Sequence, residues 1–171
     1  MKPMTGIASA IAVAVLGSVV HLPAQAQETS AVPYPSDYRT WVMVKSYVIT
    51  AESKLFKERG GFHHYYANDK ALEGYRTGKF PEGSIIVDEG VHAKDADGVT
   101  IEAILRSVEV MHKDPAYQAT GGWGYERFEG DNTAGALGAK AHSACFACHA
   151  GAKQRDYVFS TSRLAAGSKK Q

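Results

Sequence analysis

Runs of β-branched and aromatic residues, separated by Gly, Pro and Asp turn signals, recur along the chain. Such runs are typical of β-strands, whose side chains point alternately to the two faces of a sheet. We therefore predict strands at residues 41–49, 62–68, 84–91, 100–113 and 121–130.

The fourth of these runs, residues 100–113, also fits a helix, because its apolar residues recur at helical spacing. The Asp97–Gly98 pair just before it is a strong signal for a hairpin turn. Since a hairpin has strands on both sides, we expect a strand here, paired with the run before the turn.

Short helices are predicted around the strands. Residues 69–79 place apolar side chains on one face behind Asp69, a favoured N-cap residue. A helical turn is expected near Ser36 and Asp37, either of which can cap it, and residues 50–61 form a brief helix or a loop. The fold class is therefore α+β, a mostly antiparallel sheet with a few short helices, in one domain.

The first 26 residues are typical of a secretory signal peptide. Lys2 gives a positive start, an apolar run follows, and Ala24 and Ala26 form a cleavage signal. The run is short for a membrane span, so an uncleaved anchor is the weaker alternative. We expect cleavage after Ala26, a periplasmic location for a single domain at residues 27–171, and no membrane association.

The balance of acidic and basic residues indicates which kinds of binding partner the sequence supports. The chain has 19 Lys and Arg and 18 Asp and Glu, and Lys2 is the one charged residue in the predicted leader. The exported part is therefore neutral overall, which gives no support for binding nucleic acid or an anionic membrane surface. It also provides no charged patch that would identify a redox partner.

Both cysteines of the chain lie in the motif CFACH at residues 145–149. Three chemistries use such a close pair. A disulfide would close a loop too small to restrain the unfolded chain much, and no thioredoxin-like βαβ pattern surrounds it. A structural zinc ion needs four ligands, and there is no second cysteine pair to supply them.

A covalently attached haem c uses every residue of the motif. Cys145 and Cys148 would add to the two vinyl groups of the haem, and His149 would be the axial ligand of the iron. Export agrees with this assignment, because c-type haem is attached outside the cytoplasm. The other ring nitrogen of His149 needs an acceptor, which the sequence does not identify.

Histidines and methionines elsewhere are candidates for a second axial ligand: Met43, Met111, His63, His64, His92, His112 and His142. The two methionines lie in apolar patterns typical of a core. His63 and His64 are neighbours on a strand, so only one of them can face the haem. No spacing selects one candidate, which favours an open distal site.

Four stretches together resemble the cytochrome P-460 family, which includes the cytochromes c′-beta. They are YRTWVMV, FPEGSIIVDEG, GGWGYERF and CFACHAGAKQRDYVF, and they extend from about residue 38 to 159. The specific part is C-x-x-C-H followed by DYVF after a sheet-rich region. The resemblance implies a periplasmic haem c protein on an antiparallel sheet, a five-coordinate iron held by His149, and a homodimer.

The chain departs from this family at the position of a lysine. In members that oxidise hydroxylamine, that lysine is bonded to the haem ring, whereas c′-beta members lack the bond and bind NO or CO. Asp88 stands in its place here and cannot form the link, and Lys79 lies on the wrong side of the turn. His63 takes the place of a distal arginine. Asp88 and His63 are therefore our candidate catalytic residues in the distal pocket.

Three functions fit these features. The first, which we favour, is a haem protein that binds NO or a related ligand, with Asp88 accepting a proton or a hydrogen bond. The second is an enzyme that oxidises hydroxylamine or reduces peroxide, with His63 or His64 as distal base. The third is a six-coordinate electron carrier with Met43 or Met111 as the extra ligand and a periplasmic redox partner.

Overall fold

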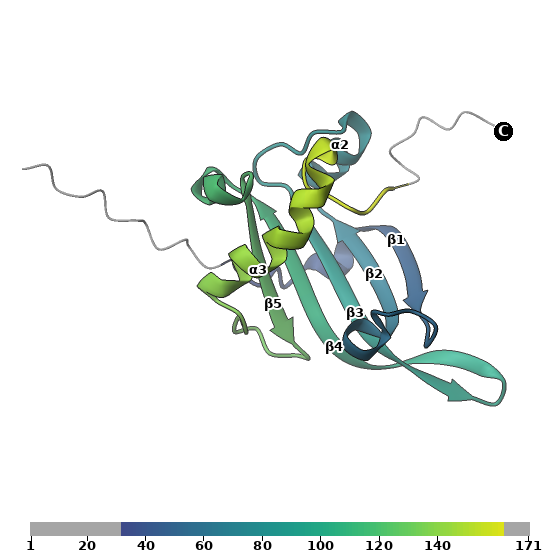
Figure 1. The fold of residues 1–171 in the computed structure, drawn as a ribbon. Helices are drawn as coiled ribbons and strands as arrows, with labels where there is room; N and C mark the ends of the chain where they lie inside the picture. Colours follow the sequence, from purple (N-terminus) through teal and green to yellow (C-terminus); the bar gives the residue numbers. More distant parts are fainter. Residues whose placement is uncertain (1–31, 163–171) are drawn as a thin grey trace, which may run out of the picture.

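The computed structural model describes residues 32–162, so the predicted signal peptide and its cleavage site lie outside the described residues. Five strands form one antiparallel sheet in which neighbours in sequence are also neighbours in space. Figure 1 shows this meander from one face. The strands are β1 (Val42–Ile49), β2 (Gly61–Ala67), β3 (Ile85–Ala96), β4 (Val99–Lys113) and β5 (Trp123–Glu129).

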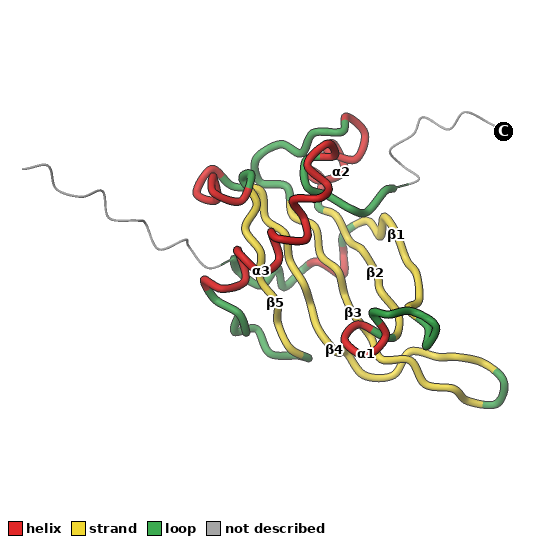
Figure 2. Tube along the Cα trace, viewed as in Figure 1, coloured by secondary structure: helices red, strands yellow, loops and turns green. Residues whose placement is uncertain are grey.

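The helical segments are short and lie around the sheet, as Figure 2 shows in red. The α-helices are α1 (Phe56–Arg59), α2 (Asp69–Thr77) and α3 (Ala139–His149), and the 3₁₀ segments are η1 (Tyr38–Thr40), η2 (Pro115–Thr120) and η3 (Ala150–Arg155). None of the helices within residues 32–162 has the length and apolar character needed to cross a membrane. The predicted fold class, an antiparallel sheet with a few short helices, is confirmed.

The ambiguous fourth run is a strand, as predicted. β3 and β4 pair on either side of the turn at Asp97 and Gly98, whose φ angles are +49° and +84°. Two positive φ angles give a turn whose twist matches that of the strands, and Asp-Gly adopts them readily. Because the turn takes only these two residues, β3 continues to Ala96, beyond its predicted end at residue 91.

The prediction that Asp69 caps α2 is wrong, because Asn68 holds that place. The Asn68 side-chain oxygen accepts hydrogen bonds from the backbone N–H groups of Ala71 at 2.9 Å and Ile85 at 3.0 Å. Its amide donates to the Gly83 carbonyl at 2.9 Å. One side chain therefore joins the end of β2, the start of α2 and the turn before β3.

Both faces of the sheet are covered. One face carries the buried cluster Val44, Ala67, Ala71, Tyr75, Phe80, Ile86, Trp123, Tyr125 and Val158. The other carries Val32, Tyr38, Val87, Val108, Val110, Tyr117 and Phe128. Helix α3 packs on β5 and crosses the first face (Figure 1). The cysteine motif therefore faces the sheet rather than a separate domain.

Candidate haem site

The cysteine motif forms the last turns of α3, as predicted. Cys145 and Cys148 are both free, Cys145 being partly buried and Cys148 exposed. A spacing of three residues places the two thiols on one side of the helix. Both cysteines and His149 line the same pocket.

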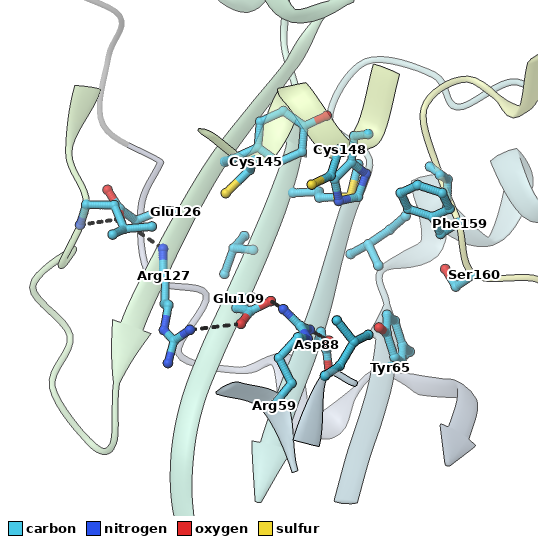
Figure 3. A pocket seen from close by; sticks show the side chains of 18 of the residues that line it. Arg59, Tyr65, Asp88, Glu109, Glu126, Arg127, Cys145, Cys148, Phe159 and Ser160 are labelled. Atoms are coloured by element: carbon cyan, nitrogen blue, oxygen red, sulfur yellow. Dashed lines mark hydrogen bonds and ion pairs between the residues drawn. The ribbon is translucent and has the colours of Figure 1, made fainter. Parts of the chain in front are cut away.

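This pocket has a volume of about 500 Å³ and lies between α3, the segment Val158–Ser160 and the first face of the sheet. Cofactor and ligand pockets commonly measure about 300–1,000 Å³. In Figure 3, Cys145 and Cys148 lie on the helix side, and Asp88 and Glu109 lie across the pocket on the strands. The pocket is thus large enough for a cofactor and has two chemically different sides.

The strand register sorts the pocket floor into two rows. Ile86, Met111 and Tyr125 are aligned across β3, β4 and β5 and form an apolar row. Two residues further along the strands, Asp88, Glu109 and Arg127 are aligned across β3 to β5 and form a charged row, with Tyr65 of β2 next to Asp88. Since alternate residues of a strand share a face, both rows point into the pocket.

His149 is held at the apolar row. Its Nδ1 lies 2.7 Å from the carbonyl oxygen of Tyr157, and because a carbonyl only accepts, Nδ1 carries the proton. The ring packs between Tyr125 and Phe159, with centroid distances of 5.0 and 5.1 Å. Burial lowers the pKa of His149, which favours the neutral ring that binds iron. Nε2 is thereby the nitrogen available to a metal.

The segment DYVF, which carried part of the family resemblance, positions this histidine. Asp156 and Tyr157 have φ angles of +52° and +65°, a left-handed conformation that costs energy for residues other than glycine. Contacts to Asp156 hold it: Lys113 Nζ lies 2.7 Å from Oδ1, the Phe80 N–H donates to Oδ2 at 2.9 Å, and Trp123 Nε1 donates to its carbonyl at 2.8 Å. The turn presents the Tyr157 carbonyl to His149.

Arg59, the last residue of α1, covers the charged row. Its two terminal nitrogens reach Asp88 Oδ2 and Glu109 Oε2, each at 2.7 Å. Burial alone would lower the pKa of the guanidinium, but Glu109 and Asp88 raise it overall. Arg127 approaches the other oxygen of Glu109 at 3.5 Å. The pocket therefore contains fixed positive and negative charges on one side.

Tyrosine hydroxyls border the charged row. The hydroxyls of Tyr47 and Tyr65 lie 2.9 Å apart, and both residues line the pocket. Burial raises the pKa of Tyr65, and the neighbouring Asp88 carboxylate raises it further. Burial also raises the pKa of Tyr47. Both phenols are therefore neutral hydrogen-bonding groups at ordinary pH.

The two candidate distal residues occupy different places. Asp88 lines the pocket and is 7% exposed. His63 is 1% exposed and lies behind Asp88, with Nδ1 at 2.8 Å from Asp88 Oδ1. His63 is not among the residues that line the pocket and contacts it through Asp88.

Among the candidate second axial ligands, Met111 is the residue that lines the pocket. It lies in the apolar row and packs on the same cluster as Cys145. The remaining candidates do not line it: Met43, His63, His64, His92, His112 and His142. His112, predicted to be solvated, is half-buried against Tyr117.

Sequence reasoning missed Arg59, Glu109, Arg127 and Tyr65. Glu109 and Met111 share a strand face by alternation, so the fourth run held a usable signal for Glu109. No signal in the sequence pointed to Arg59, because its side chain reaches the two carboxylates only when α1 folds over β3 and β4.

Two thiols and a histidine with a free Nε2, facing a pocket of cofactor size, are the groups that a covalently attached haem c requires. The residues present thus fit the cofactor. The chain belongs to the cytochrome P460 family: the model of that family, described as Cytochrome P460, matches residues 35–160. Membership implies a c-type haem protein. A comparison with curated proteins found no match.

Proposed function

We propose that the protein is an exported mono-haem cytochrome c in which His149 holds a five-coordinate iron and a small nitrogen-oxide ligand, such as NO, binds in the pocket beside the charged row. The observation that supports it best is Arg59 joined to Asp88 and Glu109 across the pocket from Cys145 and Cys148. Fixed charges beside the pocket suit a ligand on which charge develops after it binds, as on the oxygen of a nitrogen oxide.

The haem, when bound, supplies the iron and its redox chemistry. The chain supplies the surroundings. Arg59 provides N–H donors and a positive charge for negative charge that develops on a ligand oxygen. Asp88 and Glu109 keep the guanidinium in place, and their oxygens are within the same network to accept a proton from an N–H or O–H of a ligand.

The same carboxylates favour a second candidate function, the oxidation of hydroxylamine. Its N–H and O–H protons need acceptors, and Asp88 and Glu109 lie side by side on β3 and β4. Peroxide reduction would need the reverse, a proton donor, which a protonated carboxyl also provides. Asp88 cannot form the nitrogen–carbon link of a lysine, so either reaction would proceed on an unlinked haem.

A specific observation also favours the electron carrier, because Met111 lines the pocket. Met111 lies in the apolar row, opposite Tyr125, whose ring contacts His149. Binding of Met111 to the iron would close the site to external ligands and make the haem six-coordinate.

Optical spectroscopy of the purified holoprotein tests the proposal. We expect a high-spin, five-coordinate ferrous spectrum that changes on addition of NO. A methionine-to-iron charge-transfer band in the ferric protein, lost in Met111→Leu, together with no response to NO, would establish the carrier instead. Release of haem from the chain only after cleavage of thioether bonds, with no further cross-link by mass spectrometry, is expected for an unlinked ring.

Export and assembly are part of the proposal and need their own measurements. Mass spectrometry of the periplasmic protein should give a chain that begins at Gln27, and size-exclusion chromatography with light scattering should give the mass of a homodimer. A protein retained in the membrane fraction with residues 1–26 attached would instead support the uncleaved anchor.

A further inference from the structure

His63 is a buried titratable group next to the pocket with no role in the proposed function. It is 1% exposed, and its ring stacks on Tyr47 at a centroid distance of 5.1 Å. Its Nδ1 lies 2.8 Å from Oδ1 of Asp88, the carboxylate that faces the pocket. A proton on Nδ1 therefore binds His63 to Asp88 in either protonation state of the ring.

The other ring nitrogen, Nε2, has a partner for each protonation state. The Arg59 carbonyl oxygen lies 2.8 Å away and can accept from Nε2–H. Arg106 Nη2 lies 3.2 Å away and can donate to an unprotonated Nε2. The ring can therefore gain or lose a proton at Nε2 while Nε2 keeps a hydrogen-bond partner in each form, which limits the cost of either form in a buried site.

Arg106 connects this nitrogen with a second cavity. It lies at a bulge of β4, where the register shifts between Gly90 and Val91, and its guanidinium passes over Gly90, where a Cβ atom would collide with Nη2. Arg106 lines a cavity of about 270 Å³ together with Gly60, whose carbonyl accepts from Nη1. Its lining includes the polar side chains of Lys57, Glu58 and His92. A cavity of this size with several polar groups has room for water, which would connect the His63 side of Arg106 with solvent.

The charges around His63 nearly cancel when its ring is neutral. The groups that face it, from every element packed against it, are Tyr47 of β1, Arg59 of α1, Asp88 of β3 and Arg106 of β4. Arg59 also binds Glu109. Arg127 also approaches Glu109, at 3.5 Å, but has its own partner in Glu129 at 2.7 Å. The guanidinium groups of Arg59 and Arg106 are thus balanced by two carboxylates, and a proton on His63 adds a net positive charge. Such a charge is favourable when negative charge is added in the adjoining pocket.

We propose that His63 is a proton-loading residue for the haem pocket: it takes up one proton at Nε2 when an electron enters the pocket and releases it when the electron leaves. The electron comes from a one-electron reductant. The proton comes from hydronium or a protonated buffer in solution by way of the second cavity, so an O–H bond of that acid breaks and neutral water or the buffer base remains. An N–H bond forms at Nε2 and donates to the Arg59 carbonyl, while the hydrogen bond from Arg106 is lost. Oxidation reverses both changes.

This inference rests on the haem of the proposed function but not on its ligand. It is tested by potentiometric titration of the holoprotein without any nitrogen oxide, between about pH 5 and 8, where histidines titrate. We expect the midpoint potential to fall as the pH rises, approaching the about 59 mV per tenfold change in proton concentration that one proton per electron requires. A potential independent of pH would overturn the inference.

His63→Gln keeps an amide that can bond Asp88 but cannot titrate, so the pH dependence should be lost. His64→Gln is the matched control, because His64 is the next residue on β2 and bonds Ser46 and Glu102 instead. Its titration should match that of the wild type. Wild-type pH dependence in His63→Gln, or its loss in the control, would contradict the assignment.

If His63→Gln fails to fold, Arg106→Leu provides a second test of the proposal. This substitution removes a nearby positive charge and the N–H donor to neutral Nε2, so it favours the protonated ring. The pH range over which the midpoint potential changes should therefore move to higher pH. A purely structural role of His63 would leave that region in place. NO binding is measured separately. A protein that does not bind NO but shows this pH dependence of the midpoint potential, and loses it in His63→Gln, would therefore refute the proposed ligand and support the proton-loading residue.

Discussion

Asp88 and Glu109 lie directly opposite each other on β3 and β4, and both carboxylates bind the guanidinium of Arg59. Like charges at directly opposed positions of a sheet are destabilising. Arg59 compensates by placing one terminal nitrogen 2.7 Å from each carboxylate. The charged row is therefore stable only when α1 covers it, which couples the charge of the pocket to the fold.

Removal of the Arg59 charge should destabilise the protein. In Arg59→Gln the two facing carboxylates lose their shared partner, and we expect the free energy of unfolding to fall by about 1 to 3 kcal/mol. For a domain of about 150 residues this lowers the melting temperature by roughly 2–4 °C per kcal/mol. Thermal unfolding followed by circular dichroism measures it.

A second substitution distinguishes charge from packing. Arg59→Gln combined with Glu109→Gln removes one of the opposed negative charges and should recover part of the lost stability. Glu129→Gln is the control, because Glu129 makes an exposed pair with Arg127 and should change stability by less than about 0.5 kcal/mol. A double variant no more stable than Arg59→Gln alone would show that Asp88 and Glu109 do not repel each other.

Different residues should be responsible for covalent attachment of the haem and for binding of its iron. Cys145→Ser with Cys148→Ser should give a protein that carries no haem through a denaturing gel, because both thioether positions are gone. His149→Gly should keep haem on the gel but lose the axial ligand, and added imidazole should restore the wild-type spectrum. Haem that survives denaturation in the double cysteine variant would disprove the attachment sites.

Asp156 should affect both stability and the iron. Asp156→Ala removes the acceptor for Lys113 and the Phe80 N–H and places alanine at a φ of +52°. We expect a loss of about 2 to 4 kcal/mol. A displaced Tyr157 carbonyl weakens its bond from His149 Nδ1, which makes the imidazole a poorer electron donor and raises the reduction potential.

Asp156→Asn is the matched variant for that measurement. Asparagine tolerates the left-handed conformation and keeps an acceptor, so its stability and potential should lie between those of the wild type and alanine. An unchanged potential in Asp156→Ala, despite lower stability, would mean that the turn does not position His149.

His142 should make the protein less stable in acid. It is 6% exposed, its Nδ1 accepts from the Tyr125 N–H at 3.2 Å, and burial lowers its pKa below the ordinary 6.5. The unfolded chain then binds a proton more readily than the folded one. The stability from this group is complete above the unfolded pKa and is lost as the pH falls, by at most about 1.4 kcal/mol per pH unit.

Denaturant unfolding at several pH values between 4 and 8 measures this effect, and His142→Gln should flatten the acid limb. Some dependence of stability on pH should remain in His142→Gln, because burial also lowers the pKa of His112. His92→Gln, at an exposed position, should leave the curve unchanged. If His142→Gln and His92→Gln flattened the acid limb of the stability curve equally, the acid sensitivity could not be assigned to His142.

The sheet was largely predictable because strand signals are local. Alternation and β-branched residues located all five strands, and the Asp97–Gly98 turn decided the ambiguous one. Errors arose where neighbouring residues compete for one role. Asn68 rather than Asp69 caps α2, since only Asn68 also reaches Gly83 and Ile85 across the turn.

The haem-attachment motif and the strands follow from local sequence, because helical spacing and alternation are properties of consecutive residues. Tertiary structure decided everything that faces His149 across the pocket. Arg59, Asp88 and Glu109 come from α1, β3 and β4 and meet only through strand register and the position of α1. It also supplied the acceptor for His149, the carbonyl of Tyr157, because a backbone oxygen has no signature in the amino-acid sequence.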